Sequence, residues 1–127
     1  MSYRGLRQVA QLATDLDRSA EFYSVVLGRE PIGRFEPPGL LFFDLGNDTR
    51  LLLEGGASAA TLYLEVDDVH AEIDRLRAAG IAITHEPHVI FSHTNQTLGP
   101  AGTDEWQAFV TDPDGTLVGL VGYTPTA

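Results

Sequence analysis

A chain of 127 residues is long enough for one domain with a buried core and too short for two independent ones. Its formal net charge of −10, with eight arginines and no lysine, argues against binding to nucleic acid or to an anionic membrane surface, because both would be repelled. The absence of cysteine excludes disulfides and thiolate metal sites, and no segment reaches the roughly 20 apolar residues of a membrane span. No apolar run typical of a signal peptide is present near the N-terminus, so we expect a cytoplasmic protein.

One physical pattern occurs twice in the chain, in Val9–Gly28 and again in Thr61–Gly80. In each copy an alternating apolar run ends at an aspartate, Asp15 or Asp67, and an amphipathic helix follows that a glycine closes. A repeated pattern of this kind predicts two copies of one structural module. Because the chain is too short for two cores, we expect a single domain over 1–127, made of module 1–57 and module 58–127.

The first module is expected to contain a strand, a helix and three further strands. Gln8, Ala10 and Leu12 lie on one face of the first strand, and Asp15 caps the helix. The expected elements are a strand over 7–14, a helix over 16–27 closed by Gly28, a strand over 31–35, a loop at 36–39, and a hairpin of strands 40–45 and 50–54 joined at 46–49.

The second module shows the same order of elements. Its first strand places Thr61, Tyr63 and Glu65 on one face. The expected elements are strand 61–66, helix 68–79 closed by Gly80, strand 81–84, a polar loop over 92–103, strand 105–111, the turn 112–115 and strand 116–122. Together the modules predict an α+β fold built from two βαβββ units.

Three segments carry a resemblance to a known family: TDLDRSAEFYSVVLG (14–28), VDDVHAEIDRLRAAG (66–80) and FVTDPDGTLVGLV (109–121). With their spacing over nearly the whole chain, they resemble the vicinal oxygen chelate superfamily, which includes glyoxalase I, bleomycin-resistance proteins and extradiol dioxygenases. The resemblance implies two βαβββ modules that form a curved, partly closed mixed sheet around a cavity, commonly in a homodimer. It does not specify a reaction, because this scaffold serves metal enzymes and metal-free binding proteins alike.

The metal ligands of the family are mostly absent from the matching positions. Gln8 stands at the first ligand position and could bind a divalent metal through its amide oxygen, whereas Thr61 and Gly119 replace an imidazole and a carboxylate. Glu54 or Leu52 lies at the position on the fourth strand. Since a catalytic zinc site normally has three protein ligands, this set predicts no metal cofactor.

A cluster of histidines, His85, His88 and His93, offers an alternative source of metal ligands. Residues three apart in an extended strand face opposite sides, so His85 and His88 share an ion only if a bulge intervenes. We expect these histidines to have surface or hydrogen-bonded loop roles.

The family resemblance implies that the ligand cavity lies on the face of Tyr63 and Glu65. On the last strand, Leu117 and Gly119 share one side. If 112–115 is a four-residue turn, Ala108 and Trp106 pair across from Gly119 and Val121 and join the same cavity. The candidate ligand-binding residues are therefore Gln8, Leu52, Glu54, Thr61, Tyr63, Glu65, Trp106, Ala108, Leu117 and Gly119.

These observations favour a metal-free protein that binds a small molecule in an apolar, aromatic cavity, with acids that could hold a basic or hydroxylated ligand. The alternative is a metal-dependent lyase, epimerase or dioxygenase with a degenerate ligand set, completed by a histidine from 85–93 or from a partner subunit. A third possibility is an interaction module without a ligand. The sequence leaves open whether the protein is an enzyme.

Overall fold

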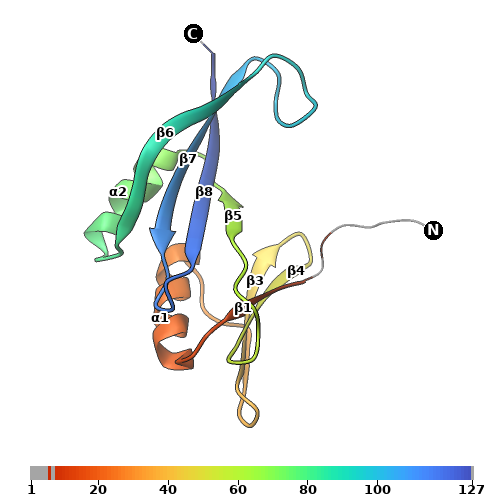
Figure 1. The fold of residues 1–127 in the computed structure, drawn as a ribbon, viewed down its shortest axis with the longest axis vertical. Helices are drawn as coiled ribbons and strands as arrows, with labels where there is room; N and C mark the ends of the chain where they lie inside the picture. The colour runs from red at the N-terminus through yellow and green to blue at the C-terminus, as the bar shows by residue number, and fades with distance from the viewer. Residues whose placement is uncertain (1–5, 7, 127) are drawn as a thin grey trace, which may run out of the picture. The chain divides into compact units, whose positions relative to one another are not determined.

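The computed structural model describes residues 6 and 8–126, and these form two compact units, each with one helix and one four-stranded sheet (Figure 1). The first unit runs to Ala60 and includes Asp112–Thr116, and the second comprises Thr61–Thr111 and the chain from Leu117 onward. Both sheets are mixed, and the described strands close no barrel. The expected α+β class with two βαβββ modules is confirmed. That the modules form a single domain around a cavity stays a prediction.

The first unit follows the expected order of elements. They are β1 (Gln8–Leu12), α1 (Leu16–Leu27), β2 (Gly33–Phe35), β3 (Leu40–Gly46) and β4 (Thr49–Glu54). The strand order is β1-β4-β3-β2, with β1 and β4 parallel and the other neighbours antiparallel. The predicted first strand also included Arg7, which lies outside the described residues.

Helix α1 begins and ends where local signals place it. The Asp15 side chain accepts hydrogen bonds from the backbone N–H groups of Asp17 and Arg18, and Gly28 closes the helix in the left-handed region at φ 67°. The helix contacts β3 and β4, whose alternate side chains are fully buried. Gln8, Leu52 and Glu54 alternate with these buried positions, so they lie on the opposite, open face of the sheet.

The hairpin between β3 and β4 turns at Asn47 and Asp48, whose φ angles of 52° and 62° are both left-handed. Two such residues form the tight loop whose twist matches a β-hairpin, and Asn and Asp tolerate this conformation better than other side chains. The predicted hairpin is confirmed.

The second unit repeats this architecture. Its elements are β5 (Leu62–Glu65), α2 (Val69–Ala78), β6 (Ile83–His93), β7 (Thr103–Thr111) and β8 (Leu117–Pro125). The order is β5-β8-β7-β6, with β5 and β8 parallel. Helix α2 covers one face, and Gly122 lets it approach β8 closely, because a Cβ there would lie 2.8 Å from a Val69 methyl group.

Both Asp67 and Asp68 fit a helix cap by residue type, and the aspartate that caps α2 is Asp68. Its carboxylate accepts from the backbone N–H of Ala71 at 3.1 Å. Two adjacent aspartates are equally good caps by residue type, and only the point where the chain leaves the extended conformation selects one. Gly80, at φ +84°, closes the helix as predicted.

The largest departure from the predicted elements is β6. A short strand over 81–84 and a polar loop from 92 were expected, but β6 runs over 11 residues to His93. Register shifts interrupt its pairing with β7, and these bulges change which way side chains point. His85 and His88 therefore pair with Phe109 and Gln107, which alternate on one face of β7, so the bulge that would bring the two histidines to the same side is present.

No helix among the described residues is long and apolar enough to cross a membrane.

Candidate functional site

The pairing of β7 with β8 decides which side chains share the open face of the second unit, the face away from α2. The connection runs over 112–116, because the backbone N–H of Asp112 donates to the carbonyl of Thr116 at 2.9 Å. Thr111 consequently faces Leu117, one position away from the register expected for a turn at 112–115. A shift of one residue moves every side chain of a strand to the opposite face.

Trp106 and Ala108 lie on the helix side of the sheet, so their predicted place beside Gly119 is wrong. The Trp106 ring packs edge-to-face on His70 of α2, with centroids 4.6 Å apart, and its indole N–H donates to Thr124. Ala108 is fully buried opposite Leu120. Both residues therefore lie on the face that α2 covers, where Ala108 is part of the core and Trp106 is half-buried.

Phe109 takes the place that was assigned to Trp106. It pairs with Gly119, and its ring centroid lies 5.9 Å from that of Tyr63 and 5.7 Å from that of His85. A Cβ on residue 119 would lie 2.9 Å from the Phe109 ring and 3.0 Å from the Tyr63 ring. Gly119 therefore leaves room for both rings against the β8 backbone. We call Tyr63, Phe109 and His85 the aromatic row.

The aromatic row is accessible to a ligand. Tyr63 is 59% exposed although it belongs to a strand. The alternation of β7 already puts Phe109 on the face opposite to Trp106 and Ala108. Which of these faces lies beside Gly119 depends on the length of the β7–β8 turn, which the sequence did not give correctly.

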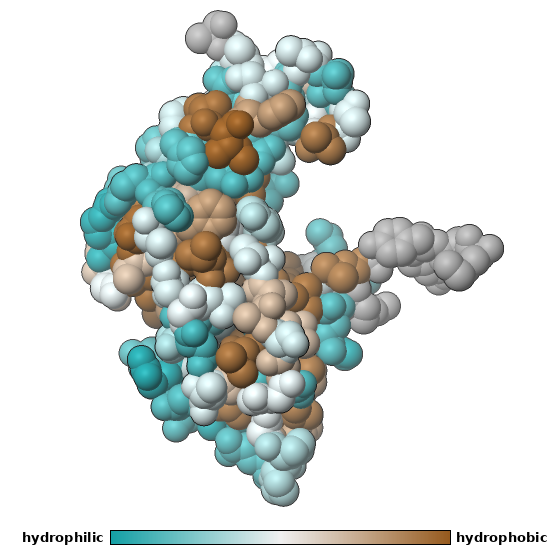
Figure 2. Space-filling model, viewed as in Figure 1, coloured by the Kyte–Doolittle hydropathy of each residue, from teal (hydrophilic) through white to brown (hydrophobic). Residues whose placement is uncertain are grey.

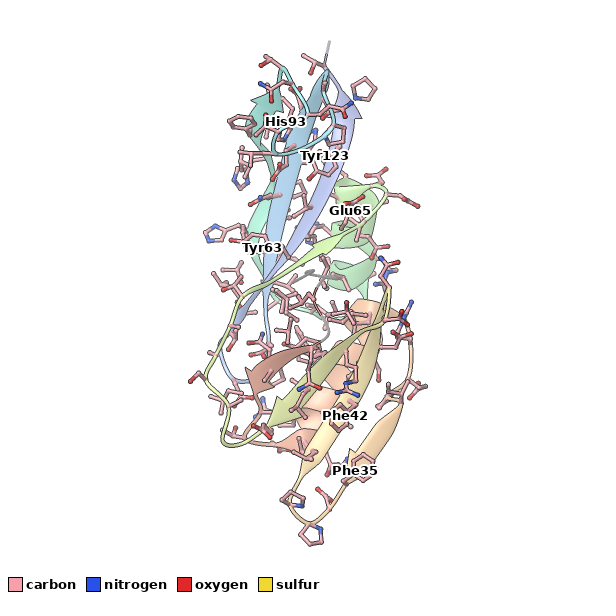
Figure 3. All side chains as sticks on the ribbon, turned by 90° about the vertical axis from the view of Figure 1, so that its right-hand side faces the viewer. Phe35, Phe42, Tyr63, Glu65, His93 and Tyr123 are labelled. Atoms are coloured by element: carbon pink, nitrogen blue, oxygen red, sulfur yellow. The ribbon has the colours of Figure 1, made fainter. Side chains whose placement is uncertain are left out.

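Acidic and polar side chains follow next to the aromatic row. Glu65 is paired with Val121, two positions along from the Tyr63–Gly119 pair. In Figure 3, Tyr63 and Glu65 follow one another along β5, and Tyr123 and His93 lie further toward the same end of the unit. Burial raises the pKa of the Tyr123 phenol, and the charges of Glu105 and Glu65 raise it further.

His93 and Glu105 form a hydrogen-bonded pair at the end of this face. The imidazole Nε2 lies 2.8 Å from a Glu105 carboxylate oxygen, and His93 is 3% exposed. The other Glu105 oxygen accepts from the Gln107 amide at 2.7 Å. The expected hydrogen-bonded role holds for His93, although it is the last residue of a strand rather than part of a loop.

On the open face of the first unit, Gln8 is already engaged. Its amide oxygen accepts from Arg50 Nε at 2.9 Å, and the Arg50 guanidinium lies 5.5 Å from the centre of the Phe42 ring. Phe42 in turn contacts Phe35 edge-to-face at 6.0 Å, and Figure 3 shows the two rings on neighbouring strands. A metal ion that binds the Gln8 oxygen would have to displace the Arg50 guanidinium.

The positions that hold the metal in family enzymes do not fit a metal in this chain. Thr61 precedes β5, and Gly119 offers no side chain, while the space above it is filled by two rings. Within residues 6 and 8–126, no three His, Asp or Glu side chains are arranged to hold a metal ion. Leu117, which pairs with Thr111, has no atom that could bind a metal and adds only apolar surface to this face.

A shallow depression of about 460 Å³ at the start of α1 contains none of the predicted site residues. Its charged groups are already engaged, since Arg34 contacts Asp17 at 2.8 Å and Glu36 at 3.1 Å, and Asp15 caps α1. The aromatic row is therefore the stronger candidate site.

The fold and this site define a class of small proteins with paired βαβββ modules. The Glyoxalase/Bleomycin resistance protein/Dioxygenase superfamily matches residues 5–120, and the chain belongs to this family.

Individual relatives include both enzymes and binding proteins. A probable lactoylglutathione lyase of Vibrio cholerae is 28% identical over 123 residues, covering 84% of this chain and 82% of the lyase. The structure of lactoylglutathione lyase from Agrobacterium tumefaciens superposes with a TM-score of 0.74 at 22% identity, covering 96% of each chain. TnmS3, an antibiotic binding protein from Streptomyces sp. CB03234, superposes with a TM-score of 0.68 at 23% identity, covering 98% of this chain and 99% of that one.

Proposed function

We propose that this protein binds a small planar aromatic molecule that carries a basic group, without a metal ion. The observation that carries the proposal is the aromatic row over Gly119, where enzymes of the family hold a metal-binding carboxylate. The Tyr63 and His85 rings are exposed and Phe109 is half-buried between them, and each ring contact with a ligand contributes about 0.5 to 1.5 kcal/mol.

Glu65 supports the basic group of the proposed ligand. Side chains two apart on a strand share one face at roughly 7 Å, so the Glu65 carboxylate is within reach of an amine attached to a ring stacked beside Tyr63. Glu105 and the Tyr123 phenol add acceptors further along the same face. The net charge of −10 also favours cationic ligands over anionic ones.

The other predicted contacts stay part of the proposal. Leu117 continues the apolar surface of β8. Thr61 lies two residues before Tyr63, so an alternating strand places both on the same face. On the first unit, Gln8, Leu52 and Glu54 share the open face with Arg50. We further propose that the protein is cytoplasmic and works as a homodimer, as the family resemblance and the exposed strand edges favour.

Isothermal titration with 2-(2-naphthyl)ethylamine, and with neutral 2-ethylnaphthalene as its analogue, tests this function. Tyr63→Ala and Phe109→Ala should each weaken binding of the amine roughly three- to tenfold, because one ring contact is lost. Glu65→Gln should weaken binding of the amine and leave the neutral analogue unchanged. Trp106→Phe is the control, since Trp106 lies on the helix side. No binding of either probe, or a loss with Trp106→Phe alone, would contradict the proposed site.

The similarity to lactoylglutathione lyases makes a metal-dependent enzyme the second candidate. We expect protein purified without chelator to hold Zn, Ni, Fe and Mn far below one ion per chain, because Thr61 and Gly119 supply no ligand atoms of the required kind. Elemental analysis measures this directly. One tightly held ion per chain that is lost in Gln8→Ala, but retained in Gln107→Ala, would favour the enzyme over the binding protein.

A further inference from the structure

Strand β6 is the outer strand of the second sheet. It pairs with β7 on one side, and none of the described strands pairs with its other side. The free side of an edge strand presents backbone N–H and C=O groups that can pair with another strand. At 11 residues, β6 is also the longest described strand.

The two halves of this edge differ in protection. In the first half, Glu86 carries a charge and pairs with Arg77, and Pro87 has no backbone N–H to donate. Charged residues and proline are the usual means by which edge strands avoid pairing. The second half, His88–His93, contains neither.

Apolar side chains gather on this unprotected half. Val89, Ile90 and Phe91 are 41%, 45% and 49% exposed, and Leu98 in the loop that follows is 75% exposed. Figure 2 shows apolar surface over the end of β6 that leads into this loop. Three consecutive exposed apolar residues on an edge strand exceed the scattered exposure that is ordinary for a soluble protein.

Charge favours a second copy of the chain as the partner. From Pro87 to Thr103 there is no Asp, Glu, Arg or Lys, and no other stretch without these residues is as long. Two copies with a net charge of −10 each repel one another, and the repulsion is weakest where the facing surfaces carry no charge. An uncharged apolar edge therefore suits self-association better than any charged face.

The other outer strands, β1, β2 and β5, are shorter, with five, three and four residues. Each therefore offers fewer backbone pairs to a partner strand than the 11 residues of β6.

We infer that His88–His93 of β6 pairs antiparallel with the same segment of a second copy, around a twofold axis that lies between the two strands. Twofold symmetry requires the antiparallel direction, because the same segment must contact itself in reverse. The pairing joins the second sheets of two copies and covers Val89, Ile90 and Phe91. This inference rests on the proposed homodimer and names its interface.

Light scattering or sedimentation equilibrium across micromolar concentrations tests the interface. The natural chain should show twice the single-chain mass of 13.8 kDa. Ile90→Lys and, separately, Val89→Lys should raise the dissociation constant at least about tenfold, because each places like charges at the centre of the interface. Ile32→Lys is the matched control, since Ile32 is 62% exposed on the first unit. It should leave the dimer intact.

The outcomes separate the two proposals. A natural chain with the mass of one copy overturns the homodimer itself. A dimer that survives both β6 lysine variants, with native circular dichroism, leaves the homodimer standing and overturns this interface. Masses above two copies contradict a closed twofold pair. None of these results bears on ligand binding, which the naphthyl probes measure separately.

Discussion

Replacing Gly119 with leucine is expected to weaken binding of the naphthyl amine by at least about tenfold while the fold survives. A Cβ at this position would already lie 2.9 Å from the Phe109 ring and 3.0 Å from the Tyr63 ring, so a leucine must push the rings out of their row. The displaced atoms are the far ends of side chains, and Tyr63 is exposed, so the strands can keep their pairing. Titration calorimetry measures the affinity, and circular dichroism verifies the fold.

Gly56 provides a matched control for this substitution. Nothing lies within 4 Å of a Cβ built there, and its backbone is not in the left-handed region. Gly56→Leu should therefore bind the probe as the natural chain does. Unchanged affinity in Gly119→Leu with native circular dichroism would place the ligand away from the aromatic row.

The largest effect on stability is expected at Tyr23, in the first unit. Its ring is fully buried, and its hydroxyl donates to an Asp112 carboxylate oxygen at 3.0 Å. Asp112 is itself buried, and its other oxygen accepts from the backbone N–H groups of Asp114 and Thr116. Tyr23→Phe removes one partner of a buried carboxylate and should lower the free energy of unfolding by about 1 to 3 kcal/mol. Tyr23→Ala also leaves a cavity and should cost about 3 to 5 kcal/mol.

Urea unfolding measures these losses, and Tyr63→Phe is the control because Tyr63 is exposed. A loss in Tyr63→Phe as large as in Tyr23→Phe would contradict a special role for the buried hydroxyl.

The same residue should make stability fall at alkaline pH. Burial raises the pKa of the Tyr23 phenol far above its ordinary value of 10.0, and the charge of Asp112 raises it further. Above pH 10 the phenol ionises in the unfolded chain but stays protonated in the folded one, so the folded state binds more protons. The free energy of unfolding should therefore decline above pH 10, and less steeply in Tyr23→Phe. Equal slopes for both proteins would show that other groups cause the decline.

Local signals in the sequence were sufficient for α1 and for the β3–β4 hairpin. The helix begins after Asp15 and ends before Gly28 as predicted, because a capping carboxylate and a left-handed glycine act within one turn. The hairpin follows from Asn47 and Asp48 in the same way. The loss of metal-ligand chemistry at Thr61 and Gly119 was also readable, since residue type alone decides whether a ligand atom exists.

Strand β6 could not be predicted from local signals, because its pairing with β7 overrides them. The sequence predicted a strand over 81–84 only, yet bulges let the strand continue through Pro87 and three histidines at the edge of the sheet. Those bulges turn His85 and His88 to one face, which no strict alternation predicts.

The sequence alone determined the family, the two βαβββ modules and the face shared by Tyr63, Glu65 and Gly119. Only the tertiary structure decided that Phe109, and not Trp106, stands beside Gly119. The reason is that side chains alternate between the two faces of a β-strand, so one more residue in the β7–β8 connection moves every β7 side chain to the opposite face. Hydrogen bonds of Asp112 set the length of that connection, and the residue types do not reveal them.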